Sequence, residues 1–195
     1  VRFAPSPTGQ LHIGGVRTAL FNYAFAKKFK GSFLLRIEDT DKERSKEEYA
    51  EQILESLKWL GFEYEDEPLK QSLRSKRYKE VINYLLETGN AYRCFASSAE
   101  LQKIRDESGS YLYPRLWRDK SKEEVDYKIL NKDEYTIRMR IPLKGNINFD
   151  DLVYGEINTD CSELDDFIIA RSDGSPTYNL TVVVDDNDMN ISHVI

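Results

Sequence analysis

The hydrophobic pattern of the first part of the chain consists of short apolar runs on either side of a longer helical pattern. Residues 1–4 and 32–37 are short apolar runs of the kind that form buried strands. Between them, over about residues 13–28, apolar side chains recur at helical spacing: Val16, Ala19, Leu20, Tyr23 and Ala24. A helix between two short strands predicts a βαβ unit, and therefore a parallel sheet with a right-handed crossover.

Two further amphipathic helices are predicted before residue 89. The first follows Ser45, which has the spacing of a capping box with Glu48, and its inward face carries Tyr49, Ile53, Leu57 and Leu60. The second covers about residues 75–88, and its inward face carries Tyr78, Val81, Ile82, Leu85 and Leu86. Gly61 and Gly89 are the expected stops of these helices.

The pattern changes after residue 89. Short strands are expected at 91–95, 135–141, 146–149, 152–157 and 167–171. Ser97 and Ser121 each open a short helix, with a glutamate three positions later. These features predict an antiparallel-rich α+β module that interrupts the sheet domain.

The end of the chain leaves one element open. Residues 176–186 contain a valine run that favours a strand, whereas Pro176 is typical of the first turn of a helix. Residues 191–195 predict a strand that returns to the sheet. Because the chain lacks an initiator Met and stops within this apolar stretch, we expect it to be a piece of a longer protein.

The charge distribution limits the classes of ligand. The chain has 195 residues, a net charge of −6 and no apolar run of eighteen residues, so neither a membrane span nor a membrane partner is predicted. The first thirty residues nevertheless hold five Lys or Arg and no acid. A sequence-independent binder of nucleic acid would be basic overall, so any nucleic-acid contact has to be local.

The two cysteines predict no metal or redox site. Cys94 and Cys161 lie far apart, and their spacing matches neither zinc-binding nor redox motifs. We interpret them as structural thiols in a reducing cytosol, and we expect a cytoplasmic protein.

The loop after the first strand is the strongest candidate for chemistry. It contains Ser6 and Thr8 among prolines and Gly9, and it leads to His12, Gly14 and Gly15 at the start of the helix. A helix N-terminus offers unpaired backbone N–H groups to an anion, and glycines let a ligand approach. The loop therefore predicts a phosphate-bearing ligand. Because it is neither a Walker A motif nor Gly-x-Gly-x-x-Gly, it fits neither the P-loop NTPases nor the dinucleotide-binding enzymes.

Three other groups of residues could bind a ligand but could equally have a structural role. Residues 38–41, Glu-Asp-Thr-Asp, follow the second strand at the sheet edge where ligands bind, but they also suit a solvated acidic turn. Asp185, Asp186 and Asp188 suit either Mg²⁺ or a solvated helix end. The aromatic residues at 111–117 suit either packing or stacking on a nucleotide.

Taken together, the motifs resemble those of bacterial glutamyl-tRNA synthetases, which are class I aminoacyl-tRNA synthetases. The resemblance rests on Arg-Phe-Ala-Pro-Ser-Pro-Thr-Gly at 2–9, His-Ile-Gly-Gly at 12–15, Leu-Phe-Asn-Tyr at 20–23, Arg-Ile-Glu-Asp-Thr-Asp at 36–41 and Pro-Thr-Tyr-Asn at 176–179. It implies an α/β fold with a Rossmann-type parallel sheet. It also implies two catalytic segments, residues 1–88 and 173–195, and an inserted α+β module, residues 89–172, that binds the tRNA acceptor arm.

The resemblance also implies roles for single residues. His12, Gly14 and Gly15 would be catalytic and would bind ATP together with Thr8. Arg2, Ser6, Glu38 and Tyr178 would bind glutamate, with Arg2 on the γ-carboxylate and Glu38 on the ammonium group. The implied partners are tRNA(Glu), L-glutamate and ATP with its Mg²⁺. The resemblance also implies that the protein is a monomer.

Departures from the family pattern leave alternatives. Some relatives hold zinc in the inserted module, but residues 96–130 contain neither Cys nor His, so no zinc is expected. The second class I signature, Lys-Met-Ser-Lys-Ser, and the anticodon-binding region are absent, so we expect this piece alone to be inactive. A non-catalytic nucleotide- or RNA-binding module and a paralogue that glutamylates a tRNA base remain alternatives.

Overall fold

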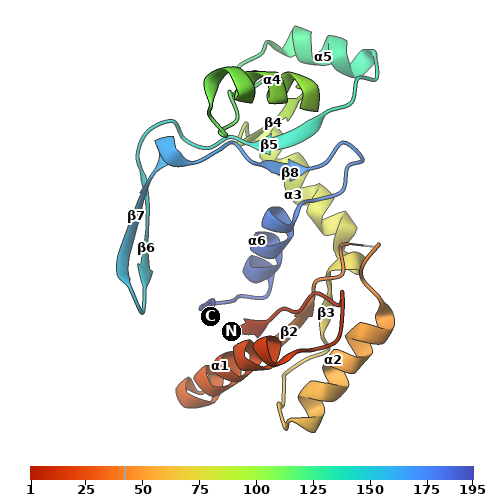
Figure 1. Ribbon diagram of the computed structural model, residues 1–195, viewed down its shortest axis with the longest axis vertical. Coiled ribbons are helices and arrows are strands. Elements are labelled where there is room, and N and C mark those ends of the chain that lie inside the picture. Colours follow the sequence, from red (N-terminus) through yellow and green to blue (C-terminus); the bar gives the residue numbers. More distant parts are fainter. Residues whose placement is uncertain (42) are drawn as a thin grey trace. The chain divides into compact units, whose positions relative to one another are not determined.

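The computed structural model describes residues 1–41 and 43–195. The described chain divides into two compact units (Figure 1). The first comprises Val1–Arg77 and Thr181–Ile195, and the second comprises Tyr78–Leu180. The boundaries between the units fall inside two helices, α3 (Ser75–Glu87) and α6 (Tyr178–Asp188).

The first unit contains a parallel sheet. Its strands are β1 (Arg2–Phe3), β2 (Leu34–Ile37) and β3 (Leu69–Lys70), in the order β1-β2-β3. The connections contain α1 (Ile13–Phe29) and α2 (Glu47–Trp59), and the 3₁₀ helix η1 (Gln71–Arg74) follows β3. The predicted βαβ unit and α/β class are therefore confirmed.

The two faces of this sheet differ in chemistry. Phe3 and Leu35 lie on one face, where they pack with Ala19 and Ala26 of α1 and Leu57 of α2 in one hydrophobic cluster. The opposite face carries Arg2 and Arg36. Because Arg2 pairs with Leu34 in the parallel register and Arg36 is two residues further along, both arginines point to the same side. The apolar face fixes the fold, and the polar face is left for the candidate site.

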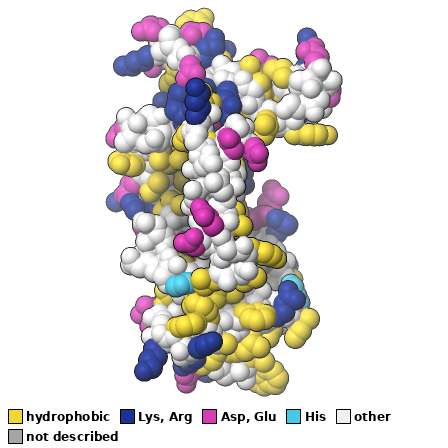
Figure 2. Space-filling model, turned by 90° about the vertical axis from the view of Figure 1, so that its left-hand side faces the viewer, with side chains coloured by type: hydrophobic (Ala, Val, Ile, Leu, Met, Phe, Trp, Pro, Cys, Tyr) yellow, Lys and Arg dark blue, Asp and Glu magenta, His cyan; other side chains and the backbone are white. Residues whose placement is uncertain are grey.

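Helix α1 packs through a stripe that matches the predicted one only in part: Ala19 is buried and Tyr23 packs against the hydrophobic cluster, as predicted, but Leu20 is not buried. Its buried residues are Ala19, Asn22 and Ala26, whereas Leu20 is 51% exposed. The two alanines let α1 lie close to the aromatic side chains of the cluster, and Asn22 donates to the Thr18 carbonyl. Figure 2 shows hydrophobic side chains gathered over the lower part of the molecule. On α1, the hydrophobic side chains of Leu20 and Phe21 are exposed.

Helix α2 also begins differently from the prediction. Its N-cap is Lys46, which makes no side-chain cap bond, and the Ser45 hydroxyl is buried without a partner, so the capping box predicted at Ser45 is wrong. Instead, the Lys46 amide donates to the Pro7 carbonyl at 3.0 Å, which ties the start of α2 to the N-terminal loop. The predicted inward residues Ile53 and Leu57 are buried.

The second unit is built from antiparallel pairs. Strands β4 (Ala91–Cys94), β5 (Thr136–Met139) and β8 (Ile168–Ala170) form one sheet in the order β4-β5-β8. Helices α4 (Ser98–Ser108) and α5 (Lys122–Leu130) are capped by Ser97 and Ser121, as predicted, and Ser121 forms a full capping box with Glu124. The buried Asp166 carboxylate accepts bonds from Tyr92 and Arg118, so a polar network lies in the core of this unit.

A separate hairpin joins β6 (Asn146–Asp151) and β7 (Gly155–Asp160), with the short helix η2 (Cys161–Glu163) after it. The predicted second strand began at residue 152, but residues 152–154 form the turn. The Asp151 carboxylate accepts the amides of Val153 and Tyr154, and Gly155 follows with φ 82°. These local bonds compete with strand pairing and delay the start of β7.

The open element at the end of the chain is helix α6. The strand predicted at 191–195 is absent from the described residues. Asn190 takes a left-handed conformation with φ 53°, and the Ile191 amide donates to the Asp186 carbonyl, which ends α6 in a turn. His193 then packs against Phe25 of α1, with ring centroids 5.0 Å apart. In the described part of the chain, no helix is long and apolar enough to cross a membrane.

Candidate active site

The loop between β1 and α1 is held against the ends of β2 and α2. The Glu38 amide donates to the Pro5 carbonyl at 2.9 Å, and the Lys46 amide donates to the Pro7 carbonyl at 3.0 Å. Within the loop, the Thr8 amide donates to the Ser6 carbonyl at 2.9 Å. Pro7 is buried, whereas the predicted ligand-binding side chains of Ser6 and Thr8 are exposed. The backbone is thus fixed while both hydroxyls face solvent.

His12 is the N-cap of α1. Its Nδ1 accepts the Gly14 amide at 3.1 Å, so in this contact the ring proton lies on Nε2. The side chain is exposed, and the first turn of α1 contains no acid. The imidazole therefore presents an Nε2–H donor beside the positive end of the helix dipole, a combination that suits an anionic ligand.

The two glycines of the site make room for side chains of the chain itself. A Cβ on Gly14 would lie 2.8 Å from His12 Cε1 and 3.0 Å from His12 Nδ1. A Cβ on Gly15 would lie 2.8 Å from Leu11 Cδ1. The sequence pattern attributed both glycines to ligand approach, and the structure adds a reason for Gly14: it lets the His12 ring cap the helix.

We expect Gly14→Ala to break the hydrogen bond between His12 and the Gly14 amide. The free energy of unfolding should change by less than about 1 kcal/mol, because the gain in helix propensity offsets the lost cap. Side-chain ¹⁵N NMR should show His12 leaving the Nε2–H tautomer for a mixture. Gly31→Ala is the control, since nothing lies within 4 Å of its Cβ position. Unchanged His12 nitrogen shifts in the Gly14 variant would contradict this role.

Arg2 and Glu38 belong to one ion-pair network on the polar face of the sheet. Arg2 holds Asp186 through Nε–Oδ1 and Nη2–Oδ2 contacts, both of 3.1 Å. The fully buried Arg36 donates from Nη1 to Asp186 Oδ1 at 2.5 Å and from Nη2 to Glu38 Oε1 at 3.2 Å. Two arginines and two carboxylates are therefore linked in the order Arg2, Asp186, Arg36, Glu38.

Burial sets the protonation behaviour of Glu38. The side chain is 7% exposed, and desolvation raises the pKa of its carboxyl above the ordinary 4.5, although the Arg36 guanidinium acts in the opposite direction. Glu38 is thus a carboxylate whose charge responds to milder acid than that of a surface glutamate.

The aspartates of α6 are paired with side chains from other elements. Asp185 is fully buried and accepts bonds from Gln71 and Arg74, and Asp188 accepts a two-bond fork from Arg77 at 2.9 Å. A solvated helix end, one of the two sequence interpretations, is therefore wrong. The Mg²⁺ interpretation gains no support, since no group of three or more His, Cys, Asp or Glu among the described residues is arranged to hold a metal ion.

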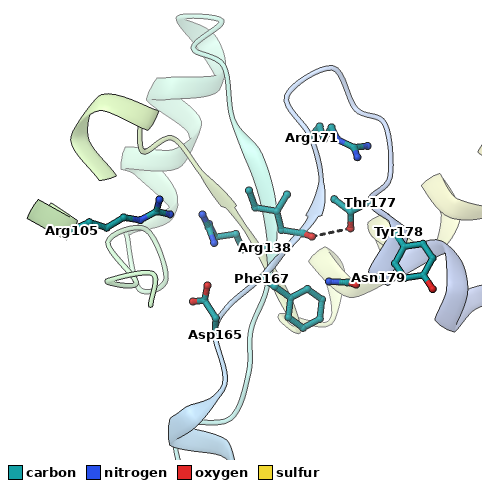
Figure 3. A pocket seen from close by; sticks show the side chains of 9 residues that line it. Arg105, Arg138, Asp165, Phe167, Arg171, Thr177, Tyr178 and Asn179 are labelled. Carbon is teal, nitrogen blue, oxygen red and sulfur yellow. Dashed lines mark hydrogen bonds between the residues drawn. The ribbon is translucent and has the colours of Figure 1, made fainter. Parts of the chain in front are cut away.

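Tyr178 lies in the second unit, where it is 60% exposed. It lines a cavity of about 390 Å³ together with Phe167, Thr177 and Asn179. Arg105, Arg138 and Asp165 also line it, and Figure 3 shows the guanidinium groups of Arg105 and Arg138 turned toward each other, with Asp165 below them. Of the predicted glutamate-binding residues, the structure thus links Arg2 and Glu38 in one network and holds the Ser6 loop against Glu38, and Tyr178 belongs to a different unit.

The aromatic residues at 111–117 divide between packing and exposure. Tyr113 is buried, and its hydroxyl lies 3.1 Å from the Cys94 sulfur in a cluster that Trp117 contacts. Tyr111 is 87% exposed.

Both cysteines, Cys94 and Cys161, are buried and free, in line with structural thiols.

Comparisons with known proteins agree on one family. The family model described as "tRNA synthetases class I (E and Q), catalytic domain" matches residues 1–195. Curated glutamate–tRNA ligases from Coprothermobacter proteolyticus and Neisseria meningitidis are 50% and 52% identical to the chain, and the alignments cover all of it. The chain spans 43% of the length of each of these relatives.

Solved structures give the same result. The crystal structure of a glutamate tRNA ligase from Elizabethkingia meningosepticum, in complex with its amino acid, is 39% identical and has a TM-score of 0.88. That alignment covers 99% of this chain and 42% of the solved one. The chain therefore belongs to the class I tRNA synthetases for glutamate and glutamine, whose catalytic domain it matches along its whole length.

Proposed function

We propose that this chain is part of a glutamate–tRNA ligase. In the first step, an oxygen of the glutamate α-carboxylate attacks the α-phosphorus of ATP, and the bond to pyrophosphate breaks. In the second, a hydroxyl of the terminal ribose of tRNA(Glu) attacks the activated carbonyl carbon, and AMP leaves. Neither step requires a covalent bond to the protein, so its contribution is positioning and charge stabilisation.

The observation that carries this proposal is the link between Arg2 and Glu38. These side chains carry opposite charges, and the contacts through Asp186 and Arg36 hold them on the same face of the sheet. Glutamate presents a γ-carboxylate to the guanidinium and an ammonium group to the carboxylate of Glu38. An arginine edge matches a carboxylate in charge and geometry, which disfavours the neutral amide of glutamine. Ser6 would contact the amino-acid end, because its loop is bonded to the Glu38 amide.

The N-terminal loop and the start of α1 would bind ATP. Thr8 is exposed, and Gly14 and Gly15 lie in the first turn of the helix, where the helix dipole favours phosphate. The Gly14 amide itself donates to His12 Nδ1, so Gly14 would contribute by leaving room for the ligand and not through its N–H. His12 directs its Nε2–H donor to solvent because Nδ1 is occupied by the Gly14 amide. In this role His12 stabilises charge that develops on the phosphates and forms no covalent bond.

For the other residues and for the partners, we propose the roles that membership of the family implies. Residues 89–172 would bind the acceptor arm of tRNA, between the catalytic segments 1–88 and 173–195, and Tyr178 would line the glutamate pocket. Mg²⁺ would arrive with ATP, whose phosphate oxygens supply ligands, and no step is assigned to it. A cytoplasmic location and a monomeric state stay predictions.

The test uses the full-length protein that contains this chain. It is incubated with ATP, tRNA and labelled glutamate or labelled glutamine, and label on tRNA is counted before and after mild alkali. The proposal expects label from glutamate alone, released by alkali as an ester of the terminal ribose. Label that resists alkali would indicate modification of a base, and absence of label would favour a binding module; either result contradicts the proposal.

We expect the KM for glutamate to rise as the pH is lowered toward the raised pKa of Glu38, at pH values above 4.5. Protonation removes the anion that binds the substrate ammonium group. Since the folded-state pKa is raised, protonation of Glu38 itself does not destabilise the fold, so circular dichroism should stay constant over this range. Glu38→Gln should have a high KM without this pH dependence, whereas Glu48→Gln, on the exposed face of α2, should keep the wild-type profile. A wild-type profile in Glu38→Gln would contradict the role.

A further inference from the structure

Only one of the two hydrogen-bonding edges of the Arg2 guanidinium is bonded to the described residues. Asp186 takes the edge formed by Nε and Nη2. Nη1 makes no hydrogen bond to the described residues. It is also not one of the side-chain nitrogens that are buried without a hydrogen-bond partner in this part of the chain, so it is accessible to solvent. A guanidinium has five N–H donors, and the edge formed by Nη1 and the second Nη2–H can take another carboxylate in a fork. Asp186 and a ligand can therefore be bound to Arg2 at the same time.

Asp186 is itself held in place from a second side. Its Oδ1 accepts from Arg36 Nη1 at 2.5 Å, and the Arg36 side chain is fully buried between Asp186 and Glu38. Arg2 is 12% exposed and Asp186 is 17% exposed, so both have little freedom to move. The direction of the open Arg2 edge is thus set by a carboxylate that the buried Arg36 fixes.

Resting on the proposed function, we propose that Asp186 is a positioning residue for glutamate selection. It holds Arg2 by one edge so that the Nη1 edge faces the γ-carboxylate of the substrate. The four charges of Arg2, Arg36, Glu38 and Asp186 sum to zero, so an unliganded site leaves no unpaired buried charge. The opposite role, in which Asp186 occupies the place of the substrate and must be displaced, predicts changes of the opposite sign.

Asp186→Asn is the variant that separates these roles. If its oxygen keeps the Oδ1 contacts with Arg2 Nε and Arg36, the amide NH₂ faces Arg2 Nη2, and two donors meet. The fork breaks on one side while size and shape are kept. Asp188→Asn is the matched control, because Asp188 is on the same helix and makes the same kind of fork with Arg77.

The experiment measures aminoacylation by the full-length protein at varied glutamate and at varied ATP. Loss of one charge-assisted contact should raise the KM for glutamate about 10- to 100-fold in Asp186→Asn and leave the KM for ATP within about twofold. Asp188→Asn should leave both within about twofold. A glutamate KM that is unchanged or lower in Asp186→Asn, or an equal rise for both substrates, would overturn the positioning role.

Two further measurements keep the test decisive. If Asp186→Asn does not fold, Asp186→Glu keeps both arginines paired but moves the Arg2 guanidinium, and the same selective rise in the glutamate KM is expected. An unchanged KM in that variant would overturn the inference. Failure of the proposed function is seen separately, because the wild-type protein would then attach no glutamate to tRNA.

Discussion

Arg2→Ala should abolish glutamate-dependent formation of the adenylate by the full-length protein while ATP binding persists. The variant removes the donors proposed for the γ-carboxylate, and it also leaves Arg36 as the one arginine still bonded to Asp186 among the described residues. ATP is assigned to the loop and to the first turn of α1, and the Arg2 guanidinium makes its hydrogen bonds to Asp186 and not to the described residues of these segments. The expected result is a glutamate KM beyond the measurable range and an ATP dissociation constant within about twofold of wild type, since no proposed ATP contact is lost.

The control for Arg2→Ala is Arg77→Ala. Arg77 makes the same two-bond fork, to Asp188 on the same helix, but its side chain is 43% exposed and has no proposed role in the site. This variant should keep the glutamate KM of the wild type. The assignment of Arg2 fails if Arg2→Ala retains the wild-type glutamate KM, or if the two variants lose activity equally.

His12→Ala should slow adenylate formation by about 10²- to 10³-fold, the loss typical of one donor that stabilises developing charge. The structure shows that the same substitution also removes the N-cap of α1, which costs about 1 kcal/mol of stability. His12→Asn separates the two effects, because asparagine is a good N-cap but has no donor at the position of Nε2. Both variants should be slow in single-turnover measurements, and only His12→Ala should unfold at lower urea.

The other histidine of the chain provides the control. His193 packs on Phe25 and bonds to Ser192, and it has no proposed part in catalysis. His193→Ala should therefore retain the wild-type single-turnover rate. A wild-type rate in His12→Asn would rule out phosphate stabilisation by His12 and would leave it a capping role.

Local patterns were sufficient to predict most elements. The helix at Ile13–Phe29 and the strand at Leu34–Ile37 follow from spacing alone, and Ser121 with Glu124 forms the capping box that its sequence predicts. The errors lie where tertiary contacts decide. Ser45 fails as a cap because the start of α2 is tied to the Pro7 carbonyl, and the strand expected at 191–195 is replaced by the turn after α6 and the packing of His193.

The candidate site was partly accessible in the same way. The loop motif placed His12 at a helix N-terminus, where the structure has it as the N-cap. The partner of Arg2 was not predictable, since Asp186 is 184 positions away and looked like part of a solvated acidic cluster. The sequence nevertheless contains a signal for this contact. Three aspartates lie within four consecutive positions near the end of the chain, and the predicted sheet carries Arg2 and Arg36 on one side. Together these features indicate ion pairs between the last helix and the sheet.

The most direct test is a crystal structure of the full-length protein with bound glutamate. We expect the γ-carboxylate on the Nη1 edge of Arg2, with Asp186 still on the Nε edge, and the ammonium group within hydrogen-bond distance of Glu38. Glutamate bound in the reverse direction, or at a site that includes neither side chain, would contradict it.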